Sequence, residues 1–256
     1  MISKNLENGR KFCKFAPSNY TMIEPALYLF PVGLSATPLS HVLPQQNLEL
    51  LREVRYYVVE NLRSARRFLK QVDRTIDIDS LTFTELSEHT LPSEIPAMLA
   101  PLERGEAVGV ISEAGCPAVA DPGADLVAAA QRRGLKVVPL VGPSSILLAL
   151  MGSGFNGQRF AFEGYLPIDE TARAKRLREM QQRIQRERQT QIFIETPYRN
   201  NRLLAELCAK LPPGMLLCVA SDLTGEHQSV RTMTLGQWAA ATYDYNKIPT
   251  IFLLYS

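Results

Sequence analysis

The sequence has 256 residues, long enough for one large domain or for two smaller domains that share a cleft, and we expect two. Lysine and arginine total 28 against 26 aspartate and glutamate, so a net charge of +2 provides no global attraction to nucleic acid. Any such attraction must be local. The four cysteines are scattered without a C-x-x-C pair, which argues against a zinc site or a disulfide framework and suits a reducing compartment.

The N-terminal segment 1–24 is polar and lacks the apolar stretch of a secretory signal. No later segment is apolar over a length that would span a membrane. We therefore expect a cytoplasmic protein with no membrane contact and no bound metal. Segment 1–24 is expected to be an extension outside the folded domains.

From residue 26 onward, short apolar runs alternate with longer amphipathic segments. The runs predict buried strands at 26–30, 55–60, 107–112 and 135–140. The amphipathic segments predict helices at 46–54, 61–71, 93–104 and 122–133. Ser93 is a candidate cap of the third helix, and Asp121, Pro122 and Gly134 are cap signals of the fourth. Alternating strands and helices predict a mostly parallel sheet, so 25–142 is expected to form an N-terminal α/β domain.

The pattern changes after a boundary expected near Gly142–Pro143. Helices are predicted at 144–151, 169–188 and 199–210. Strands are predicted at 159–166, 191–196, 215–223, 227–235 and 248–256. The later connections are shorter, which indicates mixed pairing. We therefore expect a second α/β domain over 143–256, with the cleft between the two domains.

Three loops rich in glycine and proline follow predicted strands. They are "FPVG" (30–33), "SEAGCPAVADPG" (112–123) and "LVGPSS" (140–145). Because open α/β sheets bind ligands at the carboxyl ends of their strands, three such loops predict a pocket at one sheet edge. Part of the middle loop has another explanation, since Asp121 and Pro122 are also ordinary helix-start residues. No loop matches G-x-G-x-x-G or a P-loop, which counts against a dinucleotide or P-loop nucleotide.

The run 110–155, followed by "RFAFEGYLP" and "IFIETPYR", resembles the tetrapyrrole methylase superfamily. Within it, the chain looks similar to the bacterial enzymes that methylate a ribose 2′-hydroxyl of 16S ribosomal RNA. The similarity extends over about residues 26 to 235. It implies an S-adenosylmethionine-dependent methyltransferase that binds the cofactor between two α/β domains and forms a homodimer. It also implies ribosomal RNA, or the small ribosomal subunit, as the partner.

The resemblance also implies which residues form the cofactor pocket, largely through main-chain contacts. From the strand-end loops these are Pro31, Gly33, Ser112, Glu113, Ala114, Gly115, Val119, Asp121, Pro122 and Ser144. From the later strands they are Ile194, Glu195, Leu223, Thr224, Pro249 and Thr250.

The chain departs from the ribosomal RNA enzymes at several polar positions. It has "ENLR" at 60–63 in place of E-D-T-R, Gly225 in place of a lysine, and His89 alone where a histidine and an asparagine are usual. These changes are concentrated on the substrate side, so the methyl donor is implied more firmly than the acceptor. A tetrapyrrole or another small molecule is therefore an alternative acceptor. An inactive relative that still binds the cofactor is a further alternative.

The catalytic base stays unassigned. Glu60, His89, Glu113 and Glu195 are the candidates on loops expected to face the cleft. Each has a structural alternative: Glu60, for example, could instead pair with Arg63 across one helical turn. Glu60, Arg63, Arg66 and Arg67 are the predicted substrate-binding residues, with Lys70 further along the same helix face. The charged helix 169–188 is a second basic segment, and a solvated face is the alternative for both helices.

Overall fold

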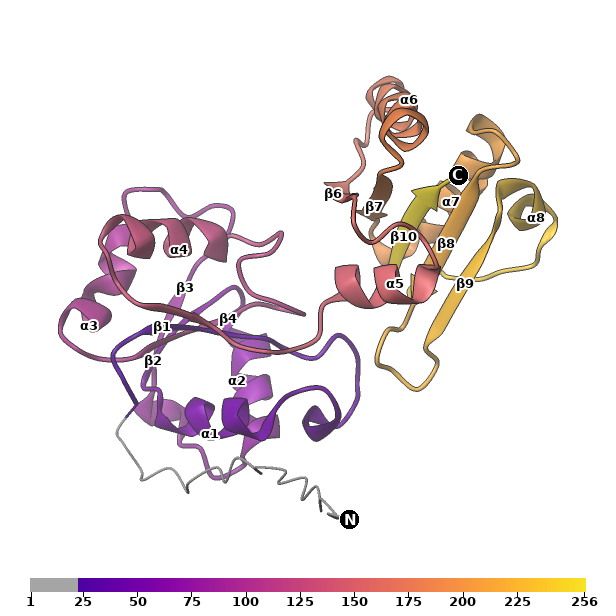
Figure 1. Cartoon of the computed structure of the whole chain (residues 1–256). Helices are drawn as coiled ribbons and strands as arrows, with labels where there is room; N and C mark the ends of the chain where they lie inside the picture. The colour runs from indigo at the N-terminus through magenta and orange to yellow at the C-terminus, as the bar shows by residue number, and fades with distance from the viewer. Residues whose placement is uncertain (1–22) are drawn as a thin grey trace, which may run out of the picture.

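The computed structural model describes residues 23–256, which fold into two α/β domains connected by the segment 140–144 (Figure 1). The expected extension 1–24 lies outside the described residues except for Ile23 and Glu24. Within the described part of the chain, no helix is long and apolar enough to cross a membrane. The expectation of two α/β domains is confirmed.

The N-terminal domain contains a five-stranded parallel sheet of order β3-β2-β4-β1-β5. The strands are β1 (Leu27–Phe30), β2 (Tyr56–Val59), β3 (Thr82–Glu85), β4 (Val108–Ile111) and β5 (Val137–Pro139). The central strands β1 and β4 are buried throughout, because helices cover both faces of the sheet. The edge strand β3, "TFTE", was not predicted, since it is polar and largely exposed.

Helices α1 (Gln45–Glu53) and α2 (Leu62–Val72) cover one face of this sheet. The 3-10 helix η3 (Ile95–Leu99), α3 (Ala100–Glu103) and α4 (Gly123–Arg132) cover the other. The prediction of one helix over 93–104 was wrong, because Pro96 and Pro101 stand at the starts of two short helices. Ser93 caps neither of them: the N-cap positions belong to Glu94 and Leu99. Two further 3-10 turns are η1 (Leu39–His41) and η2 (Ile78–Ser80).

The C-terminal domain contains a mixed five-stranded sheet of order β6-β7-β10-β8-β9. Its strands are β6 (Phe160–Tyr165), β7 (Thr190–Ile194), β8 (Leu216–Ser221), β9 (Ser229–Thr234) and β10 (Thr250–Tyr255). Only β6 and β7 pair in parallel, and the remaining pairs are antiparallel, as the short connections indicated.

The helix α5 (Ser145–Ser153) packs on one face of this second sheet, at the junction of the two domains (Figure 1). The other face is covered by α6 (Glu170–Glu187), α7 (Asn200–Lys210) and α8 (Leu235–Ala240). The turn η4 (Pro197–Arg199) directly precedes α7. Helix α8 was not predicted. It carries the buried Trp238, whose indole nitrogen donates to the Leu217 carbonyl at 2.9 Å and so ties the helix to β8.

The domains meet at the connecting segment and at a second contact across the cleft. In the connecting segment, a Cβ on Gly142 would lie 2.2 Å from the Pro31 Cβ, so only glycine fits where the chain passes the end of β1. Across the cleft, the Ser35 hydroxyl lies 3.1 Å from the Leu223 carbonyl and 3.0 Å from the Thr224 hydroxyl. A space is thus enclosed between the two sheets.

Candidate functional site

A cavity of about 300 Å³ lies between the domains, beyond the carboxyl end of β4. Eight of the predicted cofactor residues line it: Ser112, Glu113, Ala114, Gly115, Val119, Asp121, Ser144 and Ile194. Glu60, a predicted substrate residue, lines it as well. Residues of two of the three strand-end loops, 112–123 and 140–145, thus line one cavity, whereas no residue of 30–33 does.

The floor of the cavity is the loop between β4 and α4, whose backbone is strained. Gly115 has a φ of +72°, and Ala118 and Ala120 have φ values of +65° and +60°. A left-handed conformation is routine for glycine but costs an alanine about 1 kcal/mol or more. Such strain persists only where the surrounding structure holds it, and it is common at binding sites.

Asp121 holds this strained loop in place. Its Oδ1 accepts hydrogen bonds from the Ala118 N–H at 2.9 Å and from the Gly123 N–H at 2.7 Å. The prediction of Asp121 as the N-cap needs correction by one residue, because Pro122 occupies the cap position and α4 begins at Gly123. The Asp121 carboxylate nevertheless satisfies the first N–H of the helix. Burial raises the pKa of Asp121 above its ordinary value, although the two backbone donors act against this rise.

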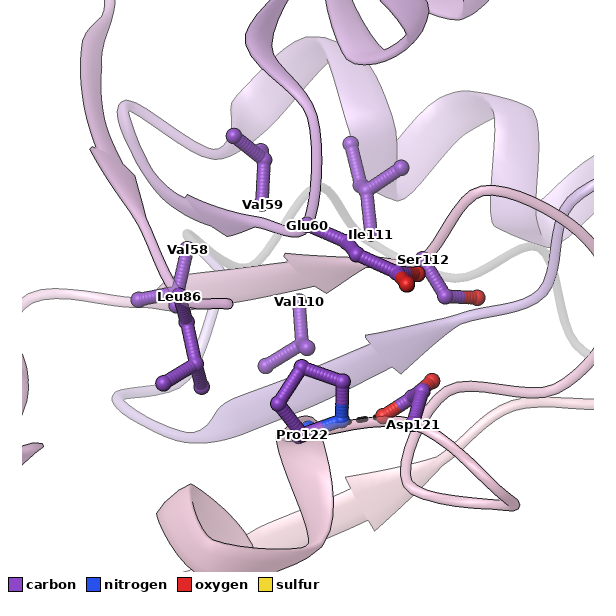
Figure 2. A pocket seen from close by; sticks show the side chains of 10 residues that line it. Val58, Val59, Glu60, Leu86, Val110, Ile111, Ser112, Asp121 and Pro122 are labelled. Atoms are coloured by element: carbon purple, nitrogen blue, oxygen red, sulfur yellow. Dashed lines mark hydrogen bonds between the residues drawn. The ribbon is translucent and has the colours of Figure 1, made fainter. Parts of the chain in front are cut away.

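Three carboxylates converge at this edge of the first sheet. Glu60 follows β2, and its Oε2 accepts a hydrogen bond from the Glu113 N–H at 3.0 Å. Burial raises the pKa of Glu60. The hydrogen bond from the Glu113 N–H lowers this pKa, whereas the negative charges of the Asp121 and Glu113 side chains raise it further. Figure 2 shows Glu60, Ser112 and Asp121 on one side of a small hollow that also has an apolar side. The suggested ion pair of Glu60 with Arg63 is absent from the described residues.

The opposite wall of the cavity belongs to the C-terminal domain. Phe162 and Tyr165 from β6, with Ile194 from β7, provide its apolar part. The start of α5 provides a polar part, where the Ser144 hydroxyl accepts a hydrogen bond from the Leu147 N–H at 3.4 Å. The cavity thus has a carboxylate-lined side and an apolar side.

The other predicted cofactor residues do not line this cavity, and their role stays a prediction. Glu195 is held by Arg199, whose Nη2 donates to the Glu195 Oε1 at 2.6 Å. Leu223 and Thr224 instead contact Ser35 in the other domain. Four others lie beside strands: Pro31 and Gly33 after β1, and Pro249 and Thr250 at the start of β10. Pro122 lines only the small hollow of Figure 2.

Two of the four acid–base candidates line the cavity and two do not. Glu60 and Glu113 face the cavity, whereas Glu195 is occupied by its arginine. His89 is 86% exposed at its side chain and lies beside Glu88 on a surface loop. Only Glu60 and Glu113 therefore remain in reach of a ligand in the cavity.

The cationic face of α2 begins next to the cavity. Asn61 caps this helix, its Oδ1 accepting from the Ser64 N–H at 3.0 Å, directly after Glu60. Arg63, Arg66, Arg67 and Lys70 are all exposed. Arg66 lies over the Phe83 ring at 5.6 Å, and Lys70 donates to backbone carbonyls beyond the end of the helix.

The second basic segment, α6, is used differently. Arg173 is buried and donates to Glu206 at 3.0 Å. Arg176 and Arg183 both pair with Glu163 of β6. These three cations stabilise the C-terminal domain, while Arg178 and Arg186 are exposed.

Several cavity residues lie outside the loops that the sequence analysis placed at the pocket: Leu34, Ile146, Phe162 and Tyr165. Cys116, Ala120 and Ser145 lie within those loops but were not named individually. One signal was available, because Gly164 within a predicted strand is typical of a bulge or of a close approach.

The chain is similar to known proteins over most of its length. The family profile of the Tetrapyrrole (Corrin/Porphyrin) Methylases matches residues 40–239. Proteins named "Ribosomal RNA small subunit methyltransferase I" are similar as well. The one from Vibrio cholerae is 30% identical, covering 90% of this chain and 77% of its own. The one from Mesorhizobium japonicum is 34% identical, covering 83% of this chain and 68% of its own.

Solved structures share the fold at low sequence identity. The methyltransferase CobJ has a TM-score of 0.60 and 18% identity, covering 90% of this chain and 94% of its own. The uroporphyrin-III-C-methyltransferase from Thermus thermophilus has a TM-score of 0.50 and 16% identity, covering 90% of this chain and 91% of its own.

Proposed function

The chain belongs to the tetrapyrrole methylase family, and from this premise we propose that it methylates a ribose 2′-hydroxyl of small-subunit ribosomal RNA. As a member, it is a methyltransferase whose methyl donor is S-adenosylmethionine. The names of the relatives support the RNA acceptor. The observation in the structure that carries the proposal is the cationic face of α2, which begins beside the cavity.

The cavity fits the methyl donor chemically. Phe162 and Ile194 offer apolar contact to an adenine ring, and the polar start of α5 lies in the same cavity. The carboxylates of Glu60, Glu113 and Asp121 line the cavity, and their negative charge favours a positively charged ligand. When bound, the cofactor supplies an electrophilic methyl group on a sulfonium. The task of the protein is to hold the acceptor oxygen in line with that group and to exclude water.

Glu60 is our proposed acceptor of the hydroxyl proton. One carboxylate oxygen receives the Glu113 N–H, which orients the side chain in the cavity. Its raised pKa makes it a stronger base than an exposed glutamate. Glu113 is less suitable, because the Ser64 hydroxyl donates to its Oε1 at 3.4 Å.

The exposed cations of α2 are our proposed contacts to the RNA backbone. Arg63 and Lys70 are seven residues apart, which corresponds to about 10 Å along a helix. The row therefore leads from the cavity over a length that more than one phosphate can contact.

The test is methyl transfer from labelled S-adenosylmethionine to small ribosomal subunits from cells that lack the gene. We expect label in ribosomal RNA, and mass spectrometry of its nucleosides to show one 2′-O-methylated nucleoside that the deletion removes. Label in a tetrapyrrole but not in RNA would contradict the proposed acceptor. Cofactor binding without transfer to either substrate would identify an inactive relative.

We also propose that the protein is a homodimer. Val141, Leu147 and Met151, in and beside α5, are 74%, 52% and 79% exposed, which is unusual for an apolar helix in a monomer. Sedimentation should give twice the mass of the 28.6 kDa chain. Met151→Glu should lower this mass, and a wild-type monomer would exclude the dimer.

A further inference from the structure

One aromatic residue of the cavity wall is exposed to an unusual degree. Tyr165, the last residue of β6, lines the cavity and is still 61% exposed. Its neighbours on the same wall, Phe162 and Ile194, are half-buried. The Tyr165 ring therefore lies at the rim, where the cavity opens to solvent.

A bulge in β6 turns Tyr165 toward the cavity. Phe162 pairs with Ile192 and Tyr165 with Ile194, so three steps along β6 correspond to two along β7. In a regular strand, residues three apart face opposite sides of the sheet, and Tyr165 would point toward α6. The extra residue places both rings on the cavity side. Gly164, with a φ of +66°, provides the left-handed backbone that this bulge needs.

Glu163 anchors the bulge from the opposite face of the sheet. Its side chain is only 9% exposed, and it accepts hydrogen bonds from Arg183 at 2.9 Å and from Arg176 at 3.3 Å. Displacing a carboxylate from two arginines at a largely buried position is costly, so the strand end is fixed. Tyr165 is thus an exposed ring on a rigid support, and such a ring loses little entropy when a ligand packs on it.

We propose that Tyr165 is the surface on which the nucleobase of the acceptor nucleotide stacks, an inference that rests on the RNA acceptor proposed above. Proteins bind single-stranded RNA by stacking unpaired bases on exposed aromatic rings. Because Tyr165 and Glu60 line the same cavity, we infer that a base stacked at the rim directs its ribose into the cavity, toward Glu60. The more enclosed Phe162 and Ile194 remain for the cofactor.

The experiment compares Tyr165→Ala, Tyr165→Phe and Tyr198→Ala. Tyr198 is the matched control, because it is 75% exposed in the same domain and does not line the cavity. Methyl transfer is measured with small subunits from cells that lack the gene, and binding of S-adenosylhomocysteine is measured by calorimetry. For Tyr165→Ala we expect the KM for subunits to rise about tenfold, the loss typical of one base–aromatic stack, with unchanged cofactor binding. Tyr165→Phe and Tyr198→Ala should behave like wild type.

Three results would overturn the proposal. The first is a wild-type KM in Tyr165→Ala. The second is a Tyr165→Phe variant as impaired as Tyr165→Ala, because this would indicate a hydrogen bond of the hydroxyl rather than stacking of the ring. A parallel loss of S-adenosylhomocysteine affinity in Tyr165→Ala would assign the ring to the cofactor. Failure of the proposed function can be told apart from failure of the stacking role by the wild type. If the wild type binds S-adenosylhomocysteine but transfers no methyl group to subunits, both proposals are wrong.

Discussion

Val32 and Gly115 exchange two backbone hydrogen bonds, from Val32 N to Gly115 O at 2.9 Å and from Gly115 N to Val32 O at 3.1 Å. This bridge ties the loop after β1 to the loop after β4. Both polar backbone groups of Gly115 are therefore used within the protein. The residue shapes the cavity by its conformation rather than by donating to a ligand.

Gly115→Val should abolish cofactor binding while the protein still folds. The φ of +72° is unfavourable for a branched residue, and a Cβ would lie 3.3 Å from Leu34 and 3.7 Å from the Pro143 carbonyl. We expect the free energy of unfolding to fall by roughly 1–3 kcal/mol. Urea unfolding and calorimetry with S-adenosylhomocysteine measure the two effects.

Gly134→Val is the control for backbone strain. Gly134 has a φ of +66° beyond the end of α4, with no atom within 4 Å of an added Cβ. This variant should lose stability and keep cofactor binding. Wild-type affinity in Gly115→Val would contradict a role of this loop in binding.

Asp121 should make stability depend on pH. Burial raises its folded-state pKa above the ordinary value of 3.8. A carboxyl that is protonated more easily when folded contributes stability below pH 3.8, and that contribution is lost as the pH rises through the folded pKa. As the pH rises from 3.8 through the folded-state pKa, the urea midpoint of wild type should therefore fall relative to that of Asp121→Asn.

The contrasting variant is Asp121→Ala. It leaves the Ala118 and Gly123 N–H groups without their acceptor, so we expect about 1–2 kcal/mol lower stability at neutral pH. Asparagine retains one oxygen for these donors and should lose less. Parallel pH profiles of wild type and Asp121→Asn would show that this carboxyl does not titrate differently in the two states.

Elements with a strong hydrophobic pattern were predictable from the sequence, and those without it were not. Strands β1 and β4 are continuous apolar runs because the sheet is covered on both faces. Strand β3 escaped prediction because an edge strand needs few buried side chains. The break between η3 and α3 depends on two prolines that also occur at ordinary helix starts.

Site residues in loops directly after strands could be predicted from the sequence. Site residues placed by the register between paired strands could not. Ser112 ends a predicted strand and Gly115 follows it, so their place at the sheet edge could be inferred. Tyr165 reaches the cavity through a register shift against β7. Gly164 signals a bulge in the sequence, but it does not specify which strand β6 pairs with or in which register. Glu195 was assigned by resemblance, and its partner Arg199 became visible only in the fold.

Ser35→Ala should weaken cofactor binding about fivefold. The Ser35 hydroxyl contacts Leu223 and Thr224 across the cleft, and the loss of one such bond costs on the order of 1 kcal/mol. If this contact holds the domains closed around the cofactor, that loss appears in the Kd for S-adenosylhomocysteine. Ser80→Ala is the control, since the Ser80 hydroxyl donates to the Asp77 carbonyl at 2.7 Å in an exposed turn. Equal affinities of the two variants would exclude this role for the contact.

Reversing two charges on α2 should weaken RNA binding and reduce its salt dependence. Arg66 and Arg67 are exposed on the helix that begins beside the cavity. Each lost phosphate contact lowers the slope of log affinity against log salt by roughly 0.7–0.9. The double variant Arg66→Glu, Arg67→Glu should therefore bind RNA more weakly across sequences, with a slope smaller by between about 1 and 2.

The matched control reverses the same number of charges on the other basic helix. Arg178 and Arg186 of α6 are exposed and lie outside the ion pairs that stabilise the C-terminal domain. The variant Arg178→Glu, Arg186→Glu changes the net charge equally, so a general electrostatic effect would weaken binding as much as the α2 variant does. Binding that is lost only in the α2 variant would assign the RNA contact to α2. An equal loss in both variants would contradict a local contact, because net charge alone would then explain it.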